Sequence, residues 1–461
     1  MLDVISTMTW LDHRITKTIK ENSKPEGKPM SRRVLILTTA ACFAAIGTAT
    51  MAGDVTEAEP IDHKIVTRVD AGPAATALEP IALTPREGGF NQNVVTAGER
   101  IFALDNTMLK LVTVQPVGVE GYSPWALGSD EGGADHEQTA PNPLSYLSAG
   151  IAANLYTSLQ QAVEVMGLAV DDMKVEVKVD FSWQAPFAPE WAGFTDLVTA
   201  NIVIESNEAP VKLAELKRLA LEGWIAGEGL ANATPVDVSL AVNGTHWDTL
   251  SGAPGLIPDP VSVDNGLTLS QKTGTPELGT IDPGLDFGMG GPMALGTDMP
   301  ASIEFSVVAV VDSANDSERP YLQRIQVRAM QDNYSGWELY ADDSFATEGL
   351  SKAPSSLDYL TAGTTLCLMS QMAITPMVLK LDIPDFRAEH QFSYRQDGYM
   401  TAGVQGFVDG IEARIVVSSD EPMEALQNYY GLSLRLCFAG EAWTGETEIL
   451  SHLFVNGALI D

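Results

Sequence analysis

The chain contains 461 residues, of which 45% are hydrophobic and 19% are charged. This composition supplies enough apolar material for two or three globular domains, and it excludes a wholly disordered chain or a collagen-like fibre. Lysine and arginine total 27 against 61 aspartate and glutamate residues, which gives a formal net charge of -34. Such a chain repels phosphate backbones, so we expect no nucleic acid partner, and solubility is the simplest role of the acidity. Three cysteines are too few for a disulfide-rich scaffold.

Residues 1–52 have the order of an export signal. Seven basic side chains lie among the first 33 residues, and no charged residue occurs from Val34 to Ala52. An acidic stretch follows, which predicts a secretory signal that is cleaved after Ala49 or Ala52 and takes Cys42 with it. The Arg32-Arg33 pair resembles a twin-arginine signal. We therefore expect an exported, periplasmic protein that uses the general secretory or the twin-arginine route.

An uncleaved membrane anchor is the alternative interpretation of the same segment. Nineteen uncharged residues can just span a hydrocarbon core of about 30 Å. In that case a single span would hold the protein at the membrane. We expect the membrane to be a partner only if this segment is not cleaved.

The sequence repeats itself at an offset of 213 residues. The run from Pro141 to Gly150 aligns with the run from Pro354 to Gly363, and six of the ten positions are identical. The same register, without gaps, continues to Asn243-Gly244 and Asn456-Gly457. A register held over about a hundred residues indicates a tandem duplication.

The duplication divides the chain into segments. Between the two copies, residues 251–300 contain ten glycines and seven prolines, a composition that cannot supply a packed core. The predicted segments are a signal or anchor at 1–52, a disordered leader at 53–97, a first copy at 98–245, a Gly/Pro-rich linker at 246–303 and a second copy at 304–461.

Each copy shows the same order of predicted elements. The alternating apolar residues of Ile325-Gln326-Val327-Arg328 predict a strand before the first helix of the second copy. Helices are predicted at 143–166, 210–224, 356–372 and 422–437. Further strands are predicted at 175–181, 197–205, 236–242, 388–394, 411–418 and 449–455. This order predicts an α+β fold in which each copy packs a β-sheet on a long buried helix and a second helix.

Two cysteines follow the repeated motif at a defined spacing. Cys367 lies eleven residues after Ser356, which stands at the second proline position of the motif, and Cys437 lies seventy residues further on. The motif Pro-x-Pro-Leu-x-Tyr-Leu-x-Ala-Gly and these spacings resemble the OsmC/Ohr family of osmotically inducible and organic-hydroperoxide-resistance proteins. The resemblance covers both copies. At the cysteine positions the first copy has Asn154 and Trp224, so it looks like a degenerate partner.

The resemblance implies a thiol peroxidase. Cys367 would attack the O–O bond of an organic peroxide or of hydrogen peroxide, and Cys437 would resolve the sulfenic acid as a disulfide. An unknown thiol reductant would recycle the disulfide. Family members form intertwined homodimers, so the tandem chain could fold as a monomeric pseudo-dimer or form a homodimer. No nucleotide-binding motif occurs and the six histidines are scattered, so we expect neither a cofactor nor a metal.

The motif does not fix the groups that would activate Cys367. Hydroperoxide-reducing members carry a glutamate ten residues before the first cysteine, where this chain has Leu357. Asp358 is the neighbouring carboxylate and a candidate supporting residue, but at ~100° per residue it falls on the far side of the helix from the thiol. A capping box with Ser355 is therefore predicted for Asp358. The candidate activating cations are Arg324, Arg328 and Arg100.

A non-enzymatic protein is the competing hypothesis. The apolar neighbours Leu366, Leu368 and Met369 would raise the pKa of the Cys367 thiol by desolvation unless a cation lies near it. The two cysteines could then form a structural disulfide or stay inert, in an exported protein that serves binding or assembly. A cation within hydrogen-bond reach of the Cys367 sulfur would favour the enzyme.

Overall fold

The computed structural model describes ten stretches of the chain, and all of them belong to one compact unit. These stretches are residues 65–69, 89–100, 108–117, 124–131, 138–246, 270–274, 276–281, 301–332, 334–344 and 351–460. The predicted signal or anchor at 1–52 lies outside the described residues, so it stays a prediction.

The described elements fall into two successive sets of the same order, each with eight strands and three helices. The first set is β1 (Val66–Arg68), β2 (Phe90–Arg100), β3 (Lys110–Val117), β4 (Trp125–Ser129), α3 (Pro143–Met166), β5 (Asp172–Gln184), β6 (Ala192–Glu205), α4 (Pro210–Gly223), α5 (Ile225–Ala231), β7 (Val236–Val242) and β8 (Thr245–His246). The second set is β9 (Ser270–Thr273), β10 (Ser302–Ser313), β11 (Leu322–Ala329), β12 (Gly336–Asp342), α6 (Ser356–Leu379), β13 (Asp385–Asp397), β14 (Gln405–Ser418), α7 (Met423–Arg435), α8 (Phe438–Thr444), β15 (Glu448–Val455) and β16 (Ala458–Leu459). We refer to these sets as the first and the second copy.

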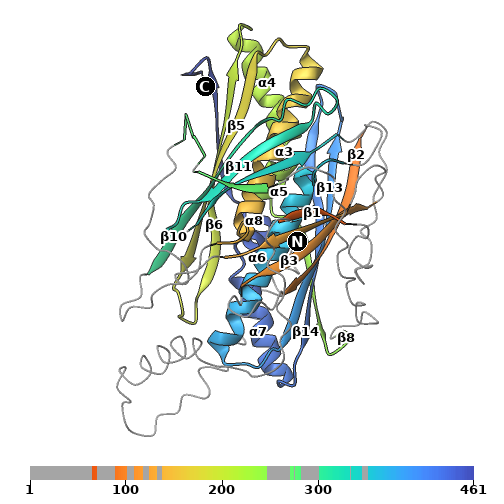
Figure 1. Ribbon diagram of the computed structural model, residues 1–461, viewed down its shortest axis with the longest axis vertical. Coiled ribbons are helices and arrows are strands. Elements are labelled where there is room, and N and C mark those ends of the chain that lie inside the picture. Colours follow the sequence, from red (N-terminus) through yellow and green to blue (C-terminus); the bar gives the residue numbers. More distant parts are fainter. Residues whose placement is uncertain are drawn as a thin grey trace. The chain divides into compact units, whose positions relative to one another are not determined.

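The two copies exchange strands. The first sheet has the order β1-β4-β3-β2-β13-β14-β7-β8, and the second has the order β9-β12-β11-β10-β5-β6-β15-β16. Each sheet thus takes six strands from one copy and the two central hairpin strands from the other. Figure 1 shows β10 alongside β5, an antiparallel pair between copies. The pairs β14·β7 and β6·β15 are parallel. The single chain therefore folds as an intertwined pseudo-dimer.

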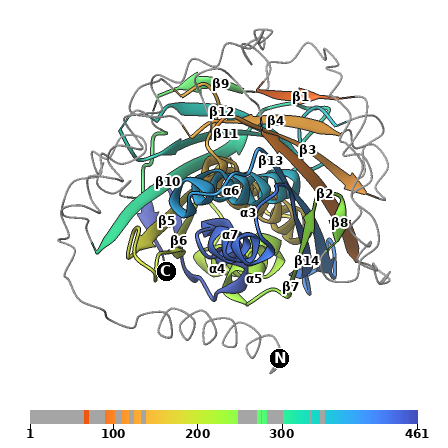
Figure 2. The same ribbon diagram turned by 90° about the horizontal axis from the view of Figure 1, so that it is seen from below.

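Two long helices form the centre of the fold. Figure 2 shows α3 and α6 side by side, with strands of both sheets around them. Both helices are apolar along most of their length, and most of their residues are buried. Asn142 caps the start of α3, and Gly167, in the left-handed conformation at φ 60°, ends it. These helices and sheets confirm the predicted α+β class.

The repeated motif lies where α3 crosses α6. A Cβ atom on Gly150 would lie 2.7 Å from the backbone nitrogen of Leu360, and one on Gly363 would lie 2.5 Å from that of Leu147. The rings of Tyr146 and Tyr359 stack across the crossing with their centroids 5.9 Å apart. The identical positions of the motif therefore hold the two copies together, and glycine is required because any side chain would separate the helices.

Substitution of Gly363 by alanine tests this crossing. Because the new Cβ would meet backbone atoms that cannot rotate away, we expect Gly363→Ala to lower the free energy of unfolding by about 1–3 kcal/mol. Gly431 in α7 has nothing within 4 Å of its Cβ position, so Gly431→Ala should instead stabilise by up to about 1 kcal/mol. Urea unfolding measures the change in the free energy of unfolding for both variants. Equal changes would contradict the close approach of α3 and α6 at Gly363.

The segments predicted as a leader and a linker both contribute strands, which corrects their assignment. The predicted leader, 53–97, contains β1 and the start of β2, and the predicted linker, 246–303, contains β9 and the start of β10. The strands β1 and β9 pair with β4 and β12 at one edge of each sheet. They escaped prediction because strands of three and four residues carry too little periodicity to stand out.

The helices also differ from their predicted ends. The helix α6 extends to Leu379 through Pro376, although proline cannot donate a hydrogen bond to the carbonyl of Met372. The hydroxyl of Tyr429 donates to that carbonyl instead, at 3.3 Å. The predicted second helices, 210–224 and 422–437, correspond to α4 and α7, and each is followed at once by a short helix, α5 or α8, that was not predicted.

Among the described residues, α6 is long and apolar enough to cross a membrane by length and composition. It is the core helix of the fold, and 67% of its most apolar window is buried. Its apolarity is thus explained by packing against α3, against α7 and α8, and against strands β2, β3 and β13.

Candidate active site

The two cysteines of the second copy lie together in the interior. Cys367 stands midway along α6, and Cys437 is the N-cap of α8. The break between α7 and α8 turns the chain at Cys437, and α8 packs against α6, so that the Cys437 thiol lies near enough to Cys367 to raise the pKa of its thiol. Both residues are 2% exposed, and both are free thiols. Two neighbouring thiols of this kind are candidates for a disulfide.

Burial dominates the electrostatics of Cys367. Desolvation raises the pKa of its thiol well above the ordinary value, and the neighbouring Cys437 and Glu131 raise it further. The backbone N–H of Ala439 opposes them, because its hydrogen bond to the sulfur favours the thiolate. The sulfur of Cys437 accepts a hydrogen bond from the backbone N–H of Gly440 at 3.3 Å. The first turn of α8 therefore supplies N–H donors to both sulfurs.

An ion pair from the first copy, with a buried lysine and a partly exposed glutamate, lies beside this site. Lys110, on β3, is 1% exposed, and its Nζ lies 3.3 Å from Oε1 of Glu131, which follows β4. Ser370, which is three residues after Cys367 on α6, donates its hydroxyl to the same carboxylate. Strands β2 and β3 pack against α6, which brings these residues to the cysteines. Lys110 and Glu131 escaped prediction because no motif marks them.

The candidate arginines have other contacts. Arg324 forms an ion pair with Asp312, with Nη2 2.5 Å from Oδ2. Arg328 donates from Nε to the carbonyl of Tyr334 at 3.2 Å. Both lie on β11, in the sheet that packs against α3. Arg100 ends β2 opposite Lys110, and its side chain lies outside the described residues.

In the first copy, the equivalents of the cysteines are fixed by hydrogen bonds. Oδ1 of Asn154 accepts from the backbone N–H of Ala226 at 3.0 Å, as Cys367 does from Ala439. The indole N–H of Trp224 donates to the carbonyl of Ile151 at 3.1 Å. The frame of the site is therefore kept in the first copy, without a redox-active group.

Asp358 is a helix cap, which confirms the predicted capping box with Ser355. The Asp358 N–H donates to Oγ of Ser355 at 3.1 Å, and the Ser355 N–H donates to Oδ2 of Asp358 at 2.7 Å. Burial raises the pKa of Asp358 to about 7, and the nearby Asp343 contributes by charge repulsion. Burial likewise raises the pKa of Asp343 to about 6. Asp358 stabilises the start of α6.

The raised pKa of Asp358 predicts how its contribution to stability depends on pH. A carboxyl whose pKa is higher in the folded than in the unfolded state stabilises the fold while it is protonated, and this contribution is lost as the pH rises from about 4 to 7. Wild type should therefore lose stability relative to Asp358→Asn between pH 5 and pH 8, by about 1.4 kcal/mol for each pH unit over which the carboxyl is protonated only in the folded state. Urea unfolding at both pH values measures this, and a constant difference would contradict it.

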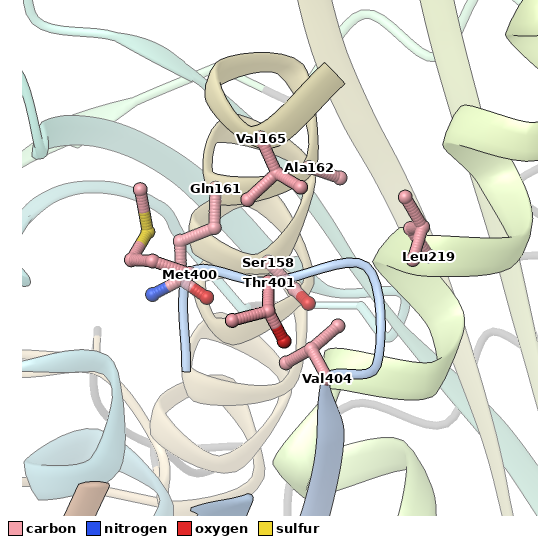
Figure 3. Close-up of a pocket in the computed structure, with 8 residues that line it drawn as sticks. All are labelled: Ser158, Gln161, Ala162, Val165, Leu219, Met400, Thr401 and Val404. Atoms are coloured by element: carbon pink, nitrogen blue, oxygen red, sulfur yellow. The ribbon is translucent and has the colours of Figure 1, made fainter. Parts of the chain in front are cut away.

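One pocket lies beside the end of α3 and another beside Trp224, and neither has a cysteine in its lining. The pocket in Figure 3, beside the end of α3, is lined by Ser158, Gln161, Ala162, Val165, Leu219, Met400, Thr401 and Val404. Its free space of about 10 Å³ fits at most one water molecule. A larger cleft of about 520 Å³ lies beside Trp224, Glu228 and Phe407. Among the described residues, no group of three His, Cys, Asp or Glu side chains could hold a metal.

Comparison with known proteins identifies the family of one copy. Residues 134–239 match the family model described as OsmC-like protein, so the chain carries an OsmC-like domain in its first copy. The match falls on the copy that lacks both cysteines. No curated protein matches the chain.

One solved structure also matches. It is an OsmC-like hydroperoxide resistance protein from Jannaschia sp. CCS1, with 21% identity and a TM-score of 0.23. The match covers 34% of this chain and 97% of that protein. At this identity and TM-score the match adds nothing to the assignment of function.

Proposed function

We propose that the protein is a thiol peroxidase whose second copy reduces organic peroxides or hydrogen peroxide through Cys367 and Cys437. The observation that carries the proposal is the proximity of the two thiols, which interact within one buried cluster although they lie seventy residues apart in the sequence. The OsmC-like family, which the first copy matches, includes hydroperoxide resistance proteins.

The chemistry needs only the two thiols and a reductant. The Cys367 thiolate attacks one peroxide oxygen, the O–O bond breaks, and the other oxygen leaves as an alcohol or as water after taking up a proton. Cys437 then attacks the sulfenic sulfur, water leaves, and a disulfide forms. A thiol reductant returns the two electrons and regenerates both cysteines. Asp358, which caps α6, supports this site by holding the helix that carries Cys367.

The remaining features belong to the same proposal. The interleaved copies suit a protein that works as a monomeric pseudo-dimer, because one chain already supplies both halves of each sheet. The export signal at 1–52 would place it in the periplasm, or at the membrane if the segment is not cleaved. In either location its reductant would have to come from a thiol system of that compartment.

A binding or assembly protein is the second candidate, and the raised pKa of Cys367 favours it. A thiol that is 2% exposed and surrounded by apolar residues has little thiolate at neutral pH, and thiolate is the nucleophile. In that case the cysteines would be structural, and the duplicated fold would serve to bind a partner.

Oxidation of the thiols by peroxide distinguishes the two functions. We expect stopped-flow mixing of the full chain carrying Cys42→Ser with hydrogen peroxide or an organic hydroperoxide to consume both remaining thiols much faster than it consumes a free thiol. The rate should rise with pH, because the pKa of Cys367 is raised and only its thiolate reacts. Hydrogen peroxide should react faster than a bulky hydroperoxide, since both thiols are buried.

Single substitutions assign the two roles. Cys367→Ser should abolish the fast phase, whereas Cys437→Ser should retain it and stop at a sulfenic acid that a dimedone-type reagent traps. Oxidation no faster than that of a free thiol in all three proteins would overturn the peroxidase and leave the binding function.

A further inference from the structure

We propose that the first copy, although it carries neither cysteine, supplies the charged half of the cysteine site: the buried Lys110 and the partly exposed Glu131 form an ion pair that controls the ionisation of the Cys367 thiol. Lys110 and Glu131 are positioning residues in this proposal, because they act on Cys367 without reacting themselves. The biological role of this control depends on the proposed peroxidase function. The effect of the ion pair on the pKa of the Cys367 thiol does not depend on that function.

The contacts connect the ion pair to the helix of the nucleophile. Nζ of Lys110 also donates to the carbonyl of Met108 at 2.8 Å, so the ammonium is held on both sides. The Ser370 hydroxyl is bound to the Glu131 carboxylate and to the Leu366 carbonyl, at 3.1 Å for the latter. The carboxylate is therefore fixed to the turn of α6 that follows Cys367, close enough to act on the Cys367 thiol by its charge.

Comparison of the two copies shows that the lysine occurs only at the site that has the thiol. At the repeat offset of 213, Lys110 corresponds to Gln323, Cys367 to Asn154, and Ser370 to Thr157. In the first-copy site, Nε2 of Gln323 donates to Oγ1 of Thr157 at 2.6 Å, and that hydroxyl donates to the buried carboxyl of Asp343. The two sites thus share a strand residue, a helix hydroxyl and a carboxyl, but only the site with the thiol has a lysine.

This placement has an electrostatic reason. A buried carboxylate beside a thiol opposes formation of the thiolate, and a cation bonded to that carboxylate offsets much of its effect. Among the described side chains, the titratable groups around Cys367 are Cys437 from α8, Glu131, which follows β4, and, behind Glu131, Lys110 from β3. Burial raises the pKa of Tyr334, before β12, and the negative charges of Glu131 and Asp130 raise it further. Removing the lysine and removing the carboxylate should therefore change thiol ionisation in opposite directions.

The test measures ionisation without using peroxide. In the full chain carrying Cys42→Ser and Cys437→Ser, Cys367 is the remaining thiol, and its rate of alkylation by iodoacetamide is followed by intact mass from pH 7 to pH 10. Lys110→Gln, which introduces the amide of the first-copy site, should slow alkylation about tenfold at pH 8, and Glu131→Gln should accelerate it by a similar factor, since tenfold corresponds to a thiol pKa that differs by one. Lys110→Arg should restore the original rate.

The controls separate charge from structure. Gln323→Ala, at the position equivalent to Lys110, should leave the alkylation profile unchanged. A change in access alone would scale the rate equally at every pH, whereas a change in ionisation moves the pH at which the rate rises. Equal directions for Lys110→Gln and Glu131→Gln, or no movement of either profile, would overturn the proposal. If the two substitutions shift the pH profile of alkylation in opposite directions but peroxide oxidation is slow, the proposed role of the ion pair is supported and the peroxidase function is overturned.

Discussion

The close approach of α3 and α6 is the constraint on which the rest of the structure depends. Gly150 and Gly363 bring the two helices within backbone contact, and Tyr146 and Tyr359 stack over the crossing. With the helices this close, α3 and α6 form one central layer, and the two sheets pack on it from different sides. Each sheet covers one of the two helices with strands of both copies, since β2, β3 and β13 pack on α6, and β5, β10 and β11 pack on α3. The most recognisable motif of the sequence is therefore a packing motif, and the chemistry depends on it only indirectly.

The exchange of strands also explains how a chain can keep a copy that has lost its cysteines. The strand β3 of the first copy packs against α6 and places Lys110 behind the carboxylate next to Cys367. The second copy contributes to the first in the same way, since Gln323 and Asp343 reach Thr157 on α3. The two sites are thus composite, and each copy can change its own helix while it still completes the site of the other.

Much of the fold could be predicted from the sequence, because local residue patterns determine many of its elements. The 213-residue offset, the two long helices, the central strands and the capping box of Ser355 and Asp358 depend on periodicity and short-range hydrogen bonding. The strand exchange depends on which distant segments pair, and alternation within a strand does not encode its partner. The strands β1 and β9 were missed because they are short and lie in Gly- and Pro-rich surroundings. The ion pair of Lys110 and Glu131 could have been found by asking which buried position differs in charge between the copies.

The interleaving has a consequence for biosynthesis. When the first copy has been made, β2 and β5 still lack the neighbours β13 and β10, and β6 and β7 lack β15 and β14. The nascent first half therefore exposes strand edges that only the second half can pair, and such edges promote association between chains. Sheet completion waits for β15, near the end of the chain, so folding is dominated by contacts between distant residues and should be slow. Tandem fusion keeps the required partner on the same chain, so correct pairing does not depend on the concentration of protein.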